Sequence, residues 1–398
     1  MLEKLAIEGG TPVRQKLLPY GRQSIDDADI DAVVAVLRSD WLTTGPNVAE
    51  FERAFASFTG AQEAVAVNSG TAALHAAYHA LGIGPGDEVI VPAMTFAATA
   101  NAVLYQGGTP VFADVEQDTL LLDPADVERR ITPRTRAIAA VDYAGQPADY
   151  AALRTLAEKH GLALVADACH APGASCGGRA VGTLADLSTF SFHPVKHLTT
   201  AEGGMITTDD AELARRMRSF RNHGITTDHR QREARGSWAY EMVDLGYNYR
   251  LSDLQCALGS SQLKKLPGWV ARRQAIAAQY AESFAGHGLL TPLRLQAGVT
   301  HAYHLYVIRL NLARLTADRG EVYRALRAEG LGVNVHYIPV HLHPFYQQRL
   351  GTAPGLCPVA EAAYHEILSL PIFPTMTDDD AESVIQAVGK VLEAFRKN

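Results

Sequence analysis

The 398-residue chain has few cysteines and no long apolar run. Its four cysteines, Cys169, Cys176, Cys256 and Cys357, lack metal-ligand spacing and are too few for a disulfide scaffold, which fits a reducing compartment. No segment approaches the ~18 apolar residues that span a membrane. Residues 1–15 carry charges where a signal peptide would be apolar. The sequence therefore predicts a cytoplasmic protein.

The chain also has little net charge, −7 at neutral pH. Such a balance offers no positive field for nucleic acid and no polybasic segment for a membrane surface, so we expect neither as a partner. The composition, 47% hydrophobic and 20% charged, is typical of a globular protein with a large core. At roughly 100–200 residues per domain, the length suggests two domains.

Short β-type runs alternate with helical periods from about residue 64. This alternation predicts an α/β fold in which a mostly parallel sheet is covered on both faces. The helix over residues 71–81 is apolar around most of its circumference and should be deeply buried. The other expected strands and helices are strands at 65–67, 88–91, 111–113, 137–141 and 162–166, and helices at 97–106, 124–130 and 150–160.

Two longer helices, near 252–266 and 268–285, are expected to lead into a second domain. We predict a large domain over 20–285, preceded by an N-terminal arm over 1–19, and a smaller C-terminal α/β domain over 286–398. Asp378 is the expected N-cap of the last helix. The elements expected in the smaller domain are strands at 305–310 and 333–337 and helices at 320–328, 360–367 and 379–396.

Lys196 is the residue on which the predicted function depends. It follows the apolar residues 187–190, and Asp167 stands 29 residues earlier at the end of another apolar strand. An amine near a buried carboxylate suits pyridoxal 5′-phosphate (PLP), because the lysine forms an imine with the cofactor and the carboxylate keeps the pyridine nitrogen protonated. An isolated aspartate here would more simply cap a loop. A buried lysine without a covalent partner is costly, so the pair together favours PLP.

The turn over residues 68–72 offers a site for the cofactor phosphate. It joins a strand to the buried helix, and free amides with a hydroxyl at a helix N-terminus favour an anion. Ser191 could supply a second hydroxyl. The alternative is a capped helix start with no ligand. Phe96 begins the helix after the second strand, where its ring could stack on the cofactor or pack in the core.

Two groups of histidines raise the question of a metal. His193 and His197 are four residues apart, but Pro194 disfavours a helix between them and no third ligand is adjacent. His336, His341 and His343 lie in a stretch that Pro339 interrupts, and they are favoured as substrate-contacting residues. We predict no metal site.

Five segments together resemble the DegT/DnrJ/EryC1/StrS family of sugar aminotransferases, a branch of the fold-type I PLP enzymes. They are residues 68–71, 167–170, 191–196, 202–204 and 246–250, and the resemblance runs from about Tyr20 to the C-terminus. It implies an aspartate aminotransferase-like fold, PLP as cofactor and a homodimer with shared active sites. Dehydratases of the family carry His where this chain has Lys196, so the lysine supports transamination.

The resemblance also implies roles for individual residues. Lys196 would bind PLP and move a proton, Asp167 would pair with the pyridinium nitrogen, and His170 would contact the 3′-oxygen. Gly70, Thr71, Ala72 and Ser191 would surround the phosphate, Phe96 would stack on the ring, and Asn248 would reach the phosphate of the neighbouring subunit. The residues that match substrate-contacting segments are Tyr20, Asp40, Trp41, Leu42, Thr43, Val335, His336, Tyr337 and Ile338.

Within the family, five further segments are similar to the C4-aminotransferases of pseudaminic acid synthesis: residues 19–24, 39–43, 193–204, 223–225 and 334–341. This likeness implies transfer of the amino group of L-glutamate to the C4 ketone of a UDP-linked 6-deoxy-N-acetylhexosamine. GDP-perosamine-type and dTDP-sugar aminotransferases are the alternatives. An amino acid desulfurase or decarboxylase and a PLP-binding regulator are further rivals, although no DNA-binding module is present.

Overall fold

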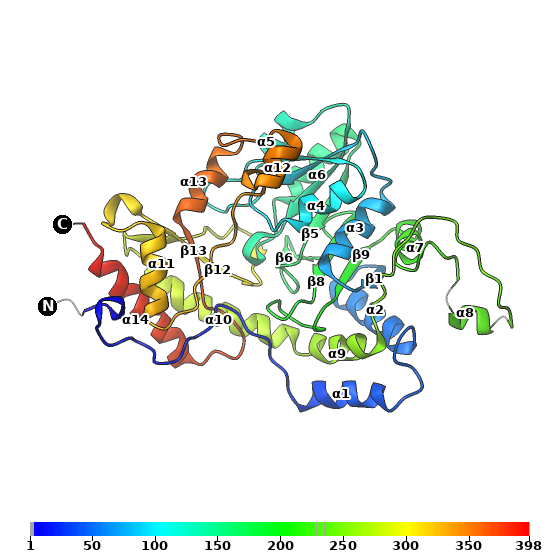
Figure 1. The fold of residues 1–398 in the computed structure, drawn as a ribbon, viewed down its shortest axis with the longest axis horizontal. Coiled ribbons are helices and arrows are strands. Elements are labelled where there is room, and N and C mark those ends of the chain that lie inside the picture. The colour runs from blue at the N-terminus through cyan, green and yellow to red at the C-terminus, as the bar shows by residue number, and fades with distance from the viewer. Residues whose placement is uncertain (1–3, 228, 235, 398) are drawn as a thin grey trace.

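The computed structural model describes residues 4–227, 229–234 and 236–397. Its largest sheet has seven strands (Figure 1), of which β9 (Gly204–Thr208) is antiparallel to both of its neighbours, β1 (Glu63–Val67) and β8 (Leu187–Ser191), while all other neighbouring strands pair in parallel. The predicted, mostly parallel sheet is confirmed. In spatial order the strands are β1, β9, β8, β5 (Ala163–Asp167), β4 (Thr135–Val141), β2 (Glu88–Pro92) and β3 (Thr109–Ala113).

Helices cover both faces of this sheet, as the sequence predicts. Successive strand residues point to opposite sides, so Ala66 and Val67 of β1 join different cores. The predicted burial of the first helix after β1 is confirmed. One face carries α2 (Pro46–Thr59), α5 (Pro124–Arg130), α6 (Tyr150–His160) and α9 (Asp253–Leu263), and the other carries α3 (Gly70–Ala80), α4 (Ala98–Tyr105) and α7 (Ala211–Phe220).

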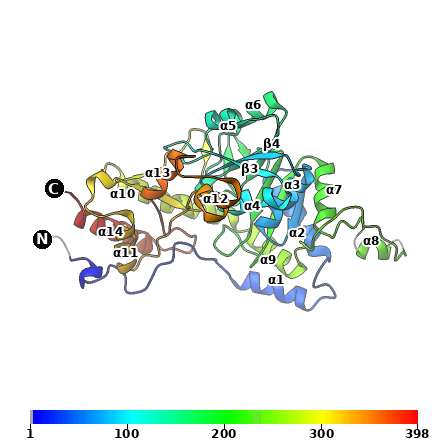
Figure 2. The ribbon, with the colours of Figure 1, turned by 45° about the horizontal axis from the view of Figure 1, so that its top comes forward.

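Two helices lie outside these layers. Helix α1 (Asp27–Leu37) packs against α9, and α8 (His229–Ala234) projects from the body of the molecule in both views (Figures 1 and 2). A small sheet of β11 (Val299–Thr300), β6 (Ser175–Cys176) and β7 (Arg179–Ala180) also lies outside the main sheet. None of the helices in the described ranges is long and apolar enough to cross a membrane.

The C-terminal part has its own antiparallel sheet and core. The second half of α10 (Leu266–Phe284) enters this core through Ile276 and Tyr280. The remaining elements are β10 (Leu290–Pro292), β12 (Tyr306–Leu310), β13 (Ile367–Leu370), α11 (Arg319–Ala328), α12 (Pro344–Leu350), α13 (Pro358–Glu366) and α14 (Asp378–Ala394).

The N-terminal arm packs against this C-terminal core. Leu5 and Leu18 are buried in it, and the buried carboxylate of Glu329 accepts hydrogen bonds from the amides of Ala6 and Val13 at 2.8 and 2.9 Å. The arm therefore ties the first residues to the last third of the chain. The domain boundary at residue 286 remains a prediction.

Three local predictions are wrong. Residues 333–337 form no strand and make one isolated bridge, from Asn334 to Ser369, because the segment leaves the sheet to run over the large domain. Thr377, not Asp378, caps α14: its hydroxyl accepts from the amide of Asp380, and the Asp380 carboxylate accepts from the amide of Thr377, both at 3.0 Å. Phe96 precedes α4 rather than beginning it.

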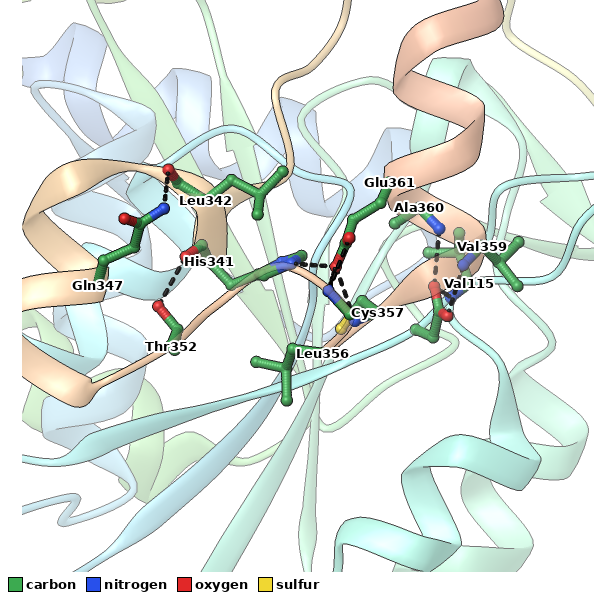
Figure 3. Close-up of polar contacts among 12 residues, drawn as sticks. Val115, His341, Leu342, Gln347, Thr352, Leu356, Cys357, Val359, Ala360 and Glu361 are labelled. Atoms are coloured by element: carbon green, nitrogen blue, oxygen red, sulfur yellow. Dashed lines mark hydrogen bonds and ion pairs between the residues drawn. The ribbon is translucent and has the colours of Figure 1, made fainter.

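A buried polar network fastens residues 340–361 to the edge of the main sheet (Figure 3). The imidazole of His341 lies 2.8 Å from the Glu361 carboxylate, which also accepts from the amide of Cys357. Asp114, just after β3, accepts hydrogen bonds from the amides of Val359 and Ala360 at 2.9 Å and so caps α13 from another element. The segment between residues 333 and 341 is thereby anchored at its downstream end.

Candidate active site

The site lies where the parallel strands of the main sheet end. Asp167 ends β5 and Ser191 ends β8, while the antiparallel β9 begins at the same edge with Gly204. Gly204 pairs with Ser191 on one side and with Val67 on the other, immediately before the turn into α3. Carboxyl ends of parallel strands are the usual place for ligands in such sheets.

Asp167 is held as a buried carboxylate by neighbouring donors. Its side chain is 7% exposed, and its Oδ2 accepts a hydrogen bond from the Thr99 hydroxyl at 2.7 Å. Its Oδ1 accepts from the amide of Cys169 at 3.4 Å. Thr99 in turn lies 2.7 Å from the Thr95 hydroxyl, so α4 fixes the orientation of the carboxylate. A positively charged ring nitrogen would find its counter-charge here.

Lys196 reaches the same space from the loop after β8. Residues 193–197 form no helix, and the amide of Lys196 donates to the carbonyl of His193 at 2.9 Å. Burial lowers the pKa of the Lys196 ammonium, while the nearby Cys169 and Asp167 oppose that shift. A larger share of this amine is therefore uncharged than in a free lysine, as a nucleophile and proton carrier requires.

Close backbone contacts form a cradle beside Ser191. A Cβ placed on Gly70 would lie 2.8 Å from the Ser191 Cβ, and one on Gly204 would lie 2.4 Å from the Ser69 carbonyl oxygen. Only glycine permits these approaches. They bring the first amides of α3, which have no intrahelical partner, next to the Ser191 hydroxyl. This arrangement fits a phosphate, because amides, a hydroxyl and the helix dipole converge on one point.

A cavity of about 500 Å³ joins these groups. The predicted site residues that line it are Tyr20, Gly70, Thr71, Phe96, Asp167, His170, Ser191, Lys196, Val335, His336 and Tyr337. The Phe96 ring is 60% exposed, so it is no core residue and is free to cover a ligand. The cavity thus brings the predicted cofactor groups together with one predicted substrate segment.

Other predicted residues lie outside this cavity. Ala72 is buried beside it, and its amide donates to the Ser69 hydroxyl that caps α3 at 3.0 Å. Ile338 does not line the cavity and is 43% exposed. Asn248 is exposed on the segment before α9, where its carbonyl accepts from the Asn68 side chain at 3.4 Å. Residues 40–43 lie before α2, away from the cavity lining.

Two groups in or beside the cavity were missed by sequence reasoning. Thr99 is fully buried and supports Asp167, and its only sequence signal is its spacing of four residues from Thr95. His304 comes from the loop before β12, and its ring centroid lies 4.3 Å from that of His170. No local pattern identifies such a residue, because the fold alone places it there.

The histidines of the two candidate metal groups have separate partners. His197 lies 2.9 Å from the Ala302 carbonyl oxygen, His336 lies 2.8 Å from the Ser369 hydroxyl, and His341 pairs with Glu361. The described ranges contain no group of three or more His, Cys, Asp or Glu side chains arranged to hold a metal ion.

Comparison with known proteins decides the family. The model of the DegT/DnrJ/EryC1/StrS aminotransferase family matches residues 23–389. The chain belongs to this family. The resemblance seen in the sequence is thereby confirmed, as is the prediction of an enzyme of the aminotransferase class.

Relatives match over nearly the whole length. The spore coat polysaccharide biosynthesis protein SpsC of Bacillus subtilis is 44% identical over 383 residues, 96% of this chain and 98% of SpsC. Helicobacter pylori PseC, an aminotransferase involved in the biosynthesis of pseudoaminic acid, has a TM-score of 0.90 at 35% identity, covering 96% of this chain and 100% of PseC. The PLP form of Spr1654, a putative sugar aminotransferase from Streptococcus pneumoniae, has a TM-score of 0.89 at 34% identity, covering 95% of this chain and 99% of Spr1654.

The family member described here is therefore a PLP-dependent sugar aminotransferase with the fold-type I architecture. The predictions of fold class and cofactor are confirmed. Membership in an aminotransferase family favours this activity over the amino acid desulfurase, decarboxylase and regulator that the sequence left open. The cavity at the strand ends brings together a carboxylate, an amine and a helix N-terminus suited to an anion, and these groups fit PLP.

Proposed function

We propose that the enzyme transfers the amino group of L-glutamate to the C4 ketone of a UDP-linked 6-deoxy-N-acetylhexosamine, forming a 4-amino-4,6-dideoxy sugar nucleotide. The observation that carries this proposal is the likeness to PseC along the whole chain. This sugar nucleotide would be used to make pseudaminic acid or a related surface glycan. Working in the cytoplasm is part of the proposal, supported by four free cysteines.

The residues of the cavity divide the chemistry among them. Bound PLP supplies an electron sink for the bond that breaks at the reacting carbon. Asp167, fixed by Thr99, would hold the protonated ring nitrogen, and Ser191 with the first amides of α3 would hold the phosphate. Lys196 would hold the cofactor covalently, and its Nζ, once displaced by the amino group of the donor, would carry a proton to and from the substrate carbon. Phe96 would cover the ring and exclude water.

A panel of ketosugars tests the substrate. Purified enzyme would be incubated with L-glutamate and UDP-, dTDP- or GDP-linked 4-keto-6-deoxy sugars, and the amino sugar and 2-oxoglutarate measured by mass spectrometry. We expect the highest kcat/KM with the UDP-linked N-acetylhexosamine. A higher kcat/KM with a dTDP or GDP sugar would replace this proposal with the corresponding alternative. Omitting glutamate and supplying other amino acids tests the donor in the same assay.

Ser191→Ala should weaken PLP binding by roughly tenfold to a hundredfold, because it removes one hydrogen bond to a charged group worth about 1.5–3 kcal/mol. Fluorescence titration of the apoenzyme with PLP measures this affinity. Ser188→Ala is the matched control: Ser188 lies on the same strand, is fully buried, and has no hydrogen-bond partner among the described residues. An equal affinity of the Ser191 and Ser188 variants would argue against the phosphate cradle.

We infer a homodimer in which Asn248 serves the neighbouring site. The segment before Asn248 exposes large apolar side chains, among them Trp238 at 88% and Leu245 at 75% exposed. Exposed apolar surface of this kind marks an interaction face. The segment is anchored to the start of α3, since the amide of Asn68 donates to the Tyr249 carbonyl at 2.9 Å. A solution mass twice the 42.9 kDa of one chain would support the dimer.

A further inference from the structure

The hydroxyl of Tyr337 enters the cavity from the segment that crosses the large domain. Its ring lies 6.0 Å from that of Phe96, and its amide donates to the sulfur of Met94 at 3.3 Å. The carbonyl of the preceding His336 accepts from the Tyr143 hydroxyl. These contacts on both sides fix where the Tyr337 side chain can lie.

The partner of this hydroxyl is His170, three residues after Asp167. The Tyr337 oxygen lies 3.1 Å from His170 Nε2, whereas Nδ1 of the same ring is buried without a partner among the described residues. Desolvation lowers the pKa of His170 well below its ordinary value, and the nearby Lys196 adds to that shift. His170 is therefore neutral, with a proton on one ring nitrogen and a lone pair, able to accept a hydrogen bond, on the other.

Two proton arrangements are available to this pair. If Nδ1 carried the proton, a buried N–H would have no acceptor, an arrangement rarely seen in folded proteins. If Nε2 carries it, His170 donates to the Tyr337 oxygen and only a lone pair on Nδ1 is left unsatisfied. The second arrangement leaves the Tyr337 O–H free to donate. Burial also raises the pKa of Tyr337, so this hydroxyl keeps its proton.

We propose that Tyr337 donates a hydrogen bond to an oxygen held in this cavity, and that His170 is the positioning residue that aims it. The acceptor is an oxygen of either the bound cofactor or the ketosugar, since both must lie beside Lys196. This refines the predicted contact of His170 with the cofactor: the contact runs through Tyr337. The inference rests on PLP lying in this cavity, as the proposed function requires.

Two readouts on the holoenzyme test the proposal. The visible absorbance of bound PLP is titrated against pH without sugar, and KM and kcat are measured with the ketosugar that the wild type prefers. The variants are Tyr337→Phe, His170→Phe, which keeps a ring, and His170→Gln, whose amide reaches the place of Nε2. Tyr346→Phe is the control, because its buried hydroxyl bonds Asn101 outside the cavity. Thermal melting checks that each variant folds.

We expect Tyr337→Phe to shift one readout by roughly tenfold, the effect of one lost hydrogen bond. If the midpoint of the absorbance titration shifts by about one pH unit, the acceptor is on the cofactor. If only the KM for the ketosugar rises, the acceptor is on the sugar. His170→Phe should reproduce that shift, His170→Gln should restore the wild-type value, and the double variant Tyr337→Phe/His170→Phe should add nothing.

The proposal is overturned if Tyr337→Phe matches Tyr346→Phe in both readouts. It is also overturned if His170→Phe has the same effect in the Tyr337→Phe background as in the wild type. A failure of the proposed function is distinguishable from either result. Borohydride reduction of wild-type holoenzyme, followed by peptide mapping, shows independently whether PLP is attached to Lys196.

Discussion

Lys196→Ala is expected to lower amino transfer by about 10²- to 10⁴-fold through the loss of proton transfer alone, with a further loss because PLP can no longer be attached covalently. The variant should still bind PLP through Ser191, the α3 amides and Asp167. Single-turnover assays and the absorbance of bound PLP measure the two effects. We expect the variant to contain PLP after purification and to lose it on dialysis, because the cofactor is no longer attached covalently.

Lys159→Ala is a suitable control, because Lys159 on α6 is exposed, pairs with Glu128 of α5 and does not line the cavity. Its turnover should equal that of the wild type. An Lys196→Ala enzyme that retains wild-type turnover would remove the basis of the proposed mechanism. A pyridoxyl label found on a peptide without Lys196 would do the same.

Asp167→Asn is expected to reduce turnover by about 10²- to 10³-fold, the usual cost of removing one preorganised electrostatic group. Asparagine can keep the hydrogen bond from Thr99 but carries no charge to hold a protonated ring nitrogen. The loss should therefore appear mainly in kcat, with PLP affinity reduced less. Steady-state kinetics and cofactor titration separate the two.

Thr99→Val provides a graded comparison with Asp167→Asn. It leaves the carboxylate charged but removes its 2.7 Å donor, at a cost of about 1.5–3 kcal/mol in a buried site. Its effect on turnover should be smaller than that of Asp167→Asn. Asp123→Asn, at the N-cap of α5 and far from the cavity, should leave turnover unchanged. The reverse order of effects for Asp167 and Thr99 would contradict the assigned role of the carboxylate.

The residues that strand–helix alternation alone brings to the cavity share one property: each stands at or just after the end of a predicted strand. Asp167 and Ser191 end β5 and β8, and the turn into α3 follows β1. In a mostly parallel sheet these ends meet at one edge whatever the loops do. The prediction of a strand at 333–337 was wrong because four consecutive residues of this segment, 334–337, line the cavity, and the segment makes only one bridge to a neighbouring strand.

The class of chemistry follows from the sequence alone: a lysine and an aspartate near the ends of two predicted strands, a turn suited to an anion at the start of a buried helix, and alternating strands and helices together indicate a PLP enzyme. These features depend on local pattern and on the geometry of parallel sheets. Which groups surround the reacting atoms was decided only by tertiary structure. His304 lines the cavity from the loop before β12, Thr99 lies buried on α4 behind Asp167, and the hydrogen bond between Tyr337 and His170 joins residues 167 positions apart. Long-range packing sets such contacts, so no local pattern reveals them.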